Sequence, residues 1–123
     1  MICNANRNAQ KLSSHYKAQR NHIKIEANNT YLHEILKCCV CKVLKNKNHS
    51  FVTEARFTSF LRADVYDLTE DVVYEIVHTE SDESIEYKML GYPVREIIVI
   101  RTKDYKDLKL SDIEKKLEKV IYF

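Results

Sequence analysis

Two carboxylates stand inside short apolar segments of the chain, and a tight polar turn joins these segments. Asp64 lies within Arg62–Asp67, Glu75 lies within Val72–Val77, and the turn comprises residues 69–71. Carboxylates are rarely buried without a reason. If the two segments pair as neighbouring strands, both acids approach one point near the edge of a sheet. Paired oxygen ligands of this kind suit Mg²⁺ or Mn²⁺, which also bind water and substrate phosphate.

A divalent cation held by Asp64 and Glu75 would activate water and stabilise the charge that builds on a phosphate. The two acids therefore predict a metal-dependent site for phosphodiester chemistry. An alternative is that both acids lie at a solvated edge of the sheet and form ion pairs with Arg62 or Lys88.

The elements that must position these acids follow from hydrophobic periodicity and turn signals. Apolar residues at helical spacing predict a helix that Asn29 or Thr30 caps and that runs to about Lys45. Three strands, a helix, a strand and a last helix follow, at 51–57, 60–68, 72–80, 81–91, 96–100 and from Ser111. We expect an α/β (α+β) fold with an αβββαβ core, in which helices flank a mixed sheet of four or more strands.

Local patterns add detail to this expectation. Short loops predict that the first three strands are antiparallel neighbours. The nearly continuous apolar segment at 96–100 is typical of a strand that is buried on both faces and often paired in parallel. Strict alternation in the first strand would place Phe51, Ala55 and Phe57 on one face. Ser111 and Glu114 form a capping-box pattern at the start of the last helix.

Bulk properties restrict the class of protein. The chain has 123 residues, 45% of them hydrophobic and 31% charged, which fits one folded domain. No apolar segment approaches membrane-spanning length and no signal peptide is recognisable, so we expect a soluble cytoplasmic protein. The single Gly, the single Pro and the many charges are typical of a thermophile's protein. Cys38 and Cys41 have zinc-ligand spacing, but a second ligand pair is missing.

Charge is distributed unevenly although the net charge is only +2. Residues 1–25 contain five basic residues and no acid, and this basic polar arm precedes a single domain at 26–123. A basic arm is a common way to hold phosphates, and the alternative is a solvated tail. The candidates for nucleic-acid binding are Arg7, Lys11, Lys17, Arg20 and Lys24 in the arm, together with Arg62 in the domain.

The order of elements and acids resembles the PD-(D/E)XK nuclease superfamily, whose fold is restriction-endonuclease-like and which includes archaeal Holliday junction resolvases and competence-type nucleases. The similarity covers residues 29–102 and is carried by His33-Glu34, Glu54, Arg62-Ala63-Asp64-Val65, Glu75-Ile76-Val77, Ser81, Lys88 and Tyr92. It implies that Asp64 and Glu75 are metal ligands and that a further acid near the first helix or first strand assists.

The chain departs from the family pattern at one position. The family usually carries a lysine two residues after the second acid, where it positions or activates water, and this chain has Val77 there. Lys88 in the second helix is the best substitute, because it flanks the apolar face between Ile85 and Tyr92. The alternative is that Lys88 is an ordinary surface lysine.

The assisting acid has several candidates. Glu54 is central in the first strand and is the favoured third metal ligand. Glu34 fits the family order, but helical spacing predicts that it faces solvent, and His33 flanks the apolar face of the same helix.

The leading hypothesis is a Mg²⁺- or Mn²⁺-dependent endonuclease that recognises DNA by its backbone and shape. Its catalytic residues would be Asp64, Glu75 and Lys88, and a homodimer would help so small a domain to reach two strands. The alternative is a catalytically degenerate nuclease-fold domain that binds DNA or a protein partner.

Overall fold

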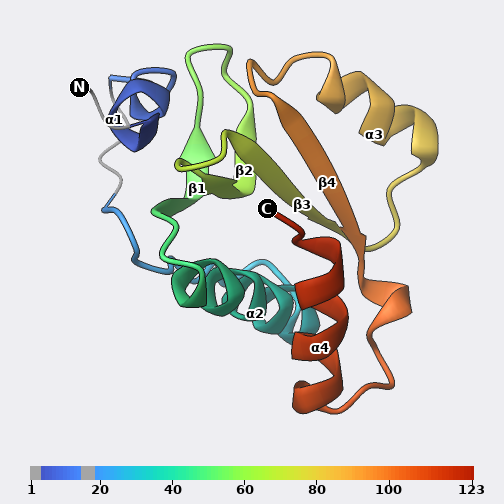
Figure 1. The fold of residues 1–123 in the computed structure, drawn as a ribbon. Helices are drawn as coiled ribbons and strands as arrows, with labels where there is room; N and C mark the ends of the chain where they lie inside the picture. The colour runs from blue at the N-terminus through green and yellow to red at the C-terminus, as the bar shows by residue number, and fades with distance from the viewer. Residues whose placement is uncertain (1–3, 15–18) are drawn as a thin grey trace.

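A computed structural model describes residues 4–14 and 19–123 of the chain (Figure 1). Among these residues no helix is long and apolar enough to cross a membrane. The elements in chain order are α1 (Asn4–Ala9), α2 (Tyr31–Asn46), β1 (Phe51–Arg56), β2 (Arg62–Asp67), β3 (Val72–Val77), α3 (Asp82–Met89), β4 (Glu96–Arg101), the 3₁₀ turn η1 (Thr102–Asp104) and α4 (Leu110–Val120).

The four strands form one mixed sheet in the order β1-β2-β3-β4. β1 pairs with β2 and β2 pairs with β3 in antiparallel fashion, while β4 lies parallel to β3. The parallel pair needs a crossover connection, and α3 supplies it. The αβββαβ order and the mixed four-stranded sheet that the sequence predicts are therefore confirmed.

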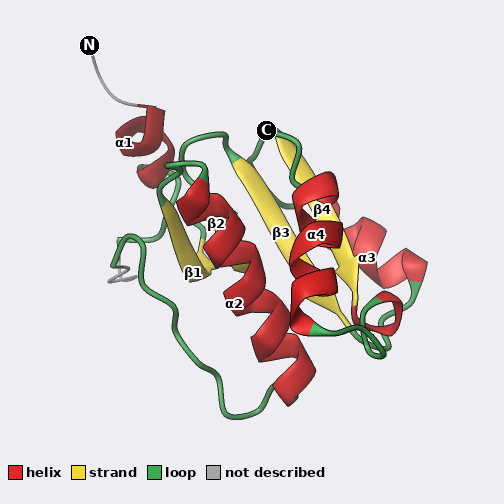
Figure 2. Cartoon of the chain, turned by 60° about the horizontal axis from the view of Figure 1, so that its bottom comes forward, coloured by secondary structure: helices red, strands yellow, loops and turns green. Residues whose placement is uncertain are grey.

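Helices cover both faces of the sheet (Figure 2). On one face α2 and α4 lie side by side, and their apolar residues pack with Val65, Tyr74 and Ile76 of the sheet. On the other face Tyr66 and Val73 pack with residues from α1 and from the segment after α3. The sheet therefore has two cores, and β2 and β3 contribute side chains to both of them.

The helix ends show how far local patterns predict structure. Thr30 caps α2 as expected, because its hydroxyl accepts a hydrogen bond from the His33 amide at 3.2 Å. The capping box predicted at Ser111 is wrong: α4 begins at Leu110, and its N-cap residue Lys109 makes no side-chain cap. The expectation that the 96–100 strand is buried on both faces is wrong, because β4 is the edge strand of the sheet and is only partly buried over most of its length.

β1 breaks the regular alternation of its side chains at Glu54. This residue has φ of 49°, a left-handed conformation that few non-glycine residues adopt. Phe51 belongs to the core beneath α2, whereas Ala55 and Phe57 belong to the core on the opposite face. The prediction that all three share one face is wrong, because the chain turns over at Glu54.

The described part of the N-terminal segment packs against the domain. Ala5 is buried, and the Asn8 side chain donates a hydrogen bond to the Leu68 carbonyl at 2.6 Å. Lys11 forms an ion pair with Asp71 at 2.7 Å. The polar composition of this segment leaves open a loose arm or a helix that needs a partner, and residues 4–14 form the second, because α1 packs against the domain.

We predict that the packing of α4 on the sheet contributes most of the stability of the core between α2, α4 and the sheet. Leu117 is fully buried between α4 and the sheet, so Leu117→Ala should reduce the free energy of unfolding by about 2–5 kcal/mol. The matched control is Leu110→Ala in the same helix, where the side chain is 65% exposed and the expected change is below about 0.5 kcal/mol. Urea unfolding measures both, and equal effects would contradict the packing described.

Candidate functional site

Asp64 and Glu75 meet where the ladder between β2 and β3 opens. Backbone pairing of the two strands ends at Val65 and Tyr74, one residue before the two acids. Beyond that point the Asp64 carboxylate accepts a hydrogen bond from the Ile76 amide at 2.8 Å. The Glu75 carboxyl accepts one from the Asp64 amide at 3.3 Å. Each acid thus accepts a hydrogen bond from a backbone amide that has no strand carbonyl opposite it. That the two carboxylates converge on one cation stays a prediction.

Glu75 lies in an environment that favours its neutral form. Burial, followed by the charge of Asp64, raises the pKa of Glu75 to about 8. The Tyr92 hydroxyl lies 2.8 Å from Glu75 Oε1 and 2.8 Å from the Arg62 carbonyl. A phenol has one proton to donate, so a protonated Glu75 lets Tyr92 donate to the carbonyl while it accepts from the acid. Near neutral pH, burial and the charge of Asp64 therefore disfavour a second negative charge on Glu75.

His33 of α2 approaches Asp64 from the other side of the sheet. Its Nε2 lies 3.3 Å from Asp64 Oδ1, and its Nδ1 lies 3.1 Å from Glu34 Oε1. Burial lowers the pKa of His33, but the hydrogen bonds and charges of Asp64 and Glu34 outweigh burial, so the pKa is raised overall. His33 therefore links Glu34 of α2 to Asp64 of the sheet.

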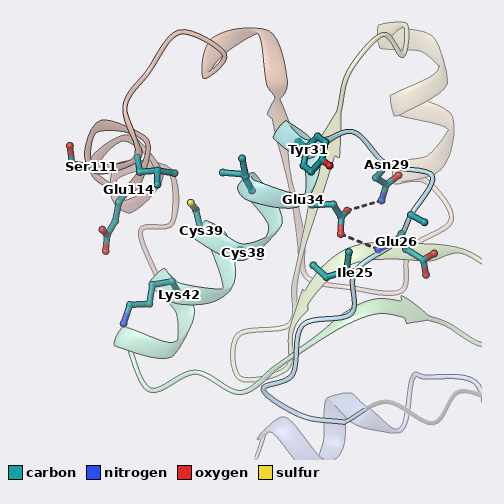
Figure 3. Close-up of a pocket in the computed structure, with 13 residues that line it drawn as sticks. Ile25, Glu26, Asn29, Tyr31, Glu34, Cys38, Cys39, Lys42, Ser111 and Glu114 are labelled. Carbon is teal, nitrogen blue, oxygen red and sulfur yellow. Dashed lines mark hydrogen bonds between the residues drawn. The ribbon is translucent and has the colours of Figure 1, made fainter.

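Glu34 is buried, so the prediction that it faces solvent is wrong. The segment before α2 folds over it, and the Glu26 amide and the Asn29 side chain donate hydrogen bonds to its two oxygens at 3.1 and 2.9 Å (Figure 3). Burial opposes ionisation, but hydrogen bonds from Lys37, Asn29, Glu26 and His33 lower the pKa of Glu34 to about 2. Helical spacing alone misplaced Glu34 because it ignores this covering segment.

Lys37 is the residue of this region that sequence analysis missed. Its side chain is fully buried, and Nζ lies 2.7–2.9 Å from Glu34 Oε2, Glu54 Oε1 and the carbonyl of Lys24. Burial lowers the pKa of Lys37, but its two carboxylate partners outweigh that effect and raise it. An ammonium group has three protons, and these three oxygens accept all of them. The spacing Glu34-x-x-Lys37 was the available signal, because residues three apart lie on one helix face.

Both carboxylate oxygens of Glu54 are bound by basic side chains of the protein. Lys37 binds Oε1, and the Nε of Arg62 lies 3.2 Å from Oε2. Within residues 4–14 and 19–123, no three His, Cys, Asp or Glu side chains are grouped so that they could hold a metal ion. The predicted cluster of Asp64, Glu75 and Glu54 is therefore not formed, and the two remaining acids are the candidates for a cation.

Lys88 lies near Glu75 but pairs with another acid. Together with Glu75 and Val77 it lines a small cavity of about 10 Å³ beneath α3, and its charge lowers the pKa of Glu75. Its ammonium lies 3.5 Å from Glu80 Oε2. Val77 is buried in the same wall. Lys88 thus lies at the edge of the candidate site, as expected for a substitute lysine, but its ammonium contacts Glu80.

A much larger cavity lies apart from the paired acids. It has a volume of about 1080 Å³ and lies between residues 25–31, α2 and α4, with mostly apolar walls that include Ile35 and Cys39 (Figure 3). Glu34 lines this cavity and also contacts His33, whereas Asp64 and Glu75 do not line it. The cavity is larger, but Asp64, Glu75 with its raised pKa, and His33 do not line it, so we place the candidate site at the opened ladder.

The predicted nucleic-acid-binding residues have different environments. Arg7 and Arg20 are exposed, whereas Lys11 is bound to Asp71 and Lys24 lies 3.4 Å from Glu26. The Arg62 side chain is 53% exposed although one face of it contacts Glu54. Lys17 lies outside the described residues.

Comparisons of the chain with protein-family models, with curated proteins and with solved structures found no match.

We predict that Lys37 stabilises the packing of α2 against β1. Lys37→Met removes the buried ammonium that Glu34 and Glu54 share, so the free energy of unfolding should fall by about 3–5 kcal/mol. Lys42→Met, an exposed position of the same helix, is the control and should change it by less than about 0.5 kcal/mol. Chemical denaturation of both variants is the measurement, and a stable Lys37→Met protein would contradict the ion-pair network.

We predict that Glu75 makes stability fall as the pH rises. Its pKa is about 8 in the folded protein against 4.5 as its ordinary value, so the folded state binds more protons between these pH values. The favourable contribution is complete below pH 4.5 and is lost as the pH rises through 8. In buffer without divalent cations, Glu75→Gln should melt like the wild type at pH 4.5 and several degrees higher at pH 8.5. Glu83→Gln, at an exposed position, should show no such difference.

Proposed function

We propose that the chain is a metal-dependent nuclease-type domain that acts on DNA, as its resemblance to the PD-(D/E)XK superfamily implies. One observation carries the proposal: Asp64 and Glu75 are brought side by side where β2 and β3 separate, and burial disfavours two negative charges there. The αβββαβ order around the two acids supports the same resemblance.

The two acids fit Mg²⁺ or Mn²⁺ better than they fit zinc. Mg²⁺ typically binds proteins through one or two carboxylates and completes its coordination with water and substrate phosphate. A structural zinc site needs about four ligands, and the described residues offer no such group. When bound, the cation would supply an activated water and electrostatic stabilisation of the phosphate.

The residues of the chain would then divide the remaining work. Asp64 and Glu75 would hold the cation through their carboxylates, and Glu75 would have to be ionised to do so. His33 fixes the orientation of the Asp64 carboxylate. Arg62 presents an exposed guanidinium to a phosphate, and Lys88 would have to leave Glu80 to reach the scissile group.

A second function is favoured by the environment of the lysine position. Val77 can neither position nor activate water, and Lys88 is paired with Glu80. Glu54, the expected third ligand, is held by Lys37 and Arg62. These observations support a catalytically degenerate domain that binds DNA without cutting it.

We predict that Mn²⁺ binding and DNA cleavage both depend on the paired acids. Asp64→Asn should weaken Mn²⁺ binding in calorimetry and lower cleavage of branched or linear DNA by about 100-fold or more. Asp112→Asn, an exposed acid of α4, is the control and should retain both properties. Mn²⁺ binding without cleavage in the wild type would favour the degenerate domain. Unchanged binding and cleavage in Asp64→Asn would overturn the assignment of the site.

A further inference from the structure

We propose that the end of the β1–β2 hairpin is a DNA-binding element in which Phe60 stacks on an unpaired base while Arg56 and Arg62 bind the flanking phosphates. This element comprises residues 56–62 and connects the two strands beyond the edge of the sheet (Figure 1). The inference rests on the proposed function in one respect, because it takes DNA as the ligand. It holds for an active nuclease and for a degenerate domain alike.

Phe60 is exposed to solvent, and its backbone conformation is energetically unfavourable. Its side chain is 98% exposed, so it contributes almost nothing to either core. Its φ is 68°, a conformation that is rare for a bulky residue and costs on the order of 1–3 kcal/mol. Glycine would meet the same backbone requirement without strain. Phe60 therefore combines a strained backbone with a ring that packs in neither core. Residues with strained backbones concentrate at functional sites.

The hairpin end holds Phe60 in place through its neighbours. The Phe57 amide donates to the Leu61 carbonyl at 2.9 Å, and the Phe60 amide donates to the Phe57 carbonyl at 3.0 Å. The Phe57 ring is buried between Tyr66 and Tyr92, with centroid distances of 4.9 and 5.6 Å. Phe60 is thus an exposed ring on a turn whose base is packed, which reduces the entropy lost on binding.

A second packing contact anchors the other side of the same turn. Leu61 lies directly against Gly91, where an added Cβ atom would clash with Leu61 Cδ1. The absence of a side chain at Gly91 therefore lets the hairpin end approach the segment that follows α3. This contact places the hairpin end beside Tyr92, whose hydroxyl bonds to the Arg62 carbonyl.

Two arginines stand at the base of the turn. Arg56 and Arg62 are cross-strand partners in the β1–β2 ladder, and like charges directly opposite each other are destabilising. Arg62 has Glu54 as a partner. Arg56 is exposed and has no acidic partner within residues 4–14 and 19–123. A phosphate between the two guanidinium groups would relieve their repulsion and accept charge-assisted hydrogen bonds.

The element adjoins the paired acids. The Tyr92 hydroxyl that lies 2.8 Å from the Arg62 carbonyl also lies 2.8 Å from Glu75 Oε1. A strand whose phosphates contact Arg56 and Arg62 therefore passes next to Glu75. Bases within a duplex already stack on one another, so a single exposed ring favours a strand with unpaired bases. The substrate class is DNA that carries a single-stranded segment, such as a flap or a branch.

The test measures DNA binding by the full chain in buffer with a chelator, so that cleavage plays no part. The probes are a fluorescein-labelled single strand and a duplex of the same sequence, with fluorescence anisotropy as the readout. Phe60→Ala should weaken single-strand binding roughly tenfold, and Phe60→Trp should restore it. Tyr31→Ala is the matched control, because Tyr31 is 91% exposed but lies at the start of α2, and its affinity should be unchanged.

Two further variants separate a binding role from a structural one. Phe60→Gly relieves the positive φ, so it should raise the melting temperature while it weakens DNA binding. Arg56→Gln should reduce by about one the slope of log affinity against log salt concentration.

The outcomes distinguish this inference from the proposed nuclease function. Equal single-strand affinities of Phe60→Ala, Tyr31→Ala and wild type would overturn the inference, whether or not the protein cuts DNA. Phe60-dependent binding without cleavage would support the inference and contradict the nuclease function. A wild type that does not bind the single strand would overturn the inference as well. So would a Phe60→Ala variant that keeps its DNA affinity and loses binding to a protein partner.

Discussion

The structure depends on a break in a β-ladder. β2 and β3 stop pairing through their backbones at Val65 and Tyr74, and an opened ladder leaves amides that must find other acceptors. The carboxyls of Asp64 and Glu75 supply those acceptors for the amides of Ile76 and Asp64. This solution brings two acids together in a partly buried place, where one of them is driven toward its neutral form.

Charge alternates along the side chains that surround this break. Arg62, Glu54, Lys37, Glu34 and His33 form a continuous chain of contacts that ends on Asp64. Buried ion pairs of this kind contribute little net stability compared with well-packed apolar residues, although removal of one member is costly. Their value lies in fixing the positions of the acids. The two strained residues of β1 and the following turn, Glu54 and Phe60, lie in the same region, as is common near functional sites.

Sequence analysis predicted the features that depend on local patterns. Helical periodicity and the Thr30 cap placed α2, turn spacing gave the antiparallel strands, and the continuous apolar segment at 96–100 gave the parallel strand. It failed where distant segments decide. The fold of residues 24–29 over α2 buries Glu34. The spacing Glu34-x-x-Lys37 could indicate one ion pair, but it does not reveal that Glu54 and the Lys24 carbonyl also bind the Lys37 ammonium. A left-handed backbone is usually predicted from a glycine, and Glu54 is not a glycine, so the change of face along β1 was not predictable.

The central claim is that Asp64 and Glu75 together bind one divalent cation. The most direct measurement is an anomalous difference map from crystals grown with Mn²⁺ near pH 8.5, where Glu75 is ionised. One strong peak should lie at about 2.1 Å from a carboxylate oxygen of each acid, the usual distance for such an ion. The peak should disappear in Asp64→Asn. A map without a peak between these acids, or with its only peak on other residues, would contradict the account.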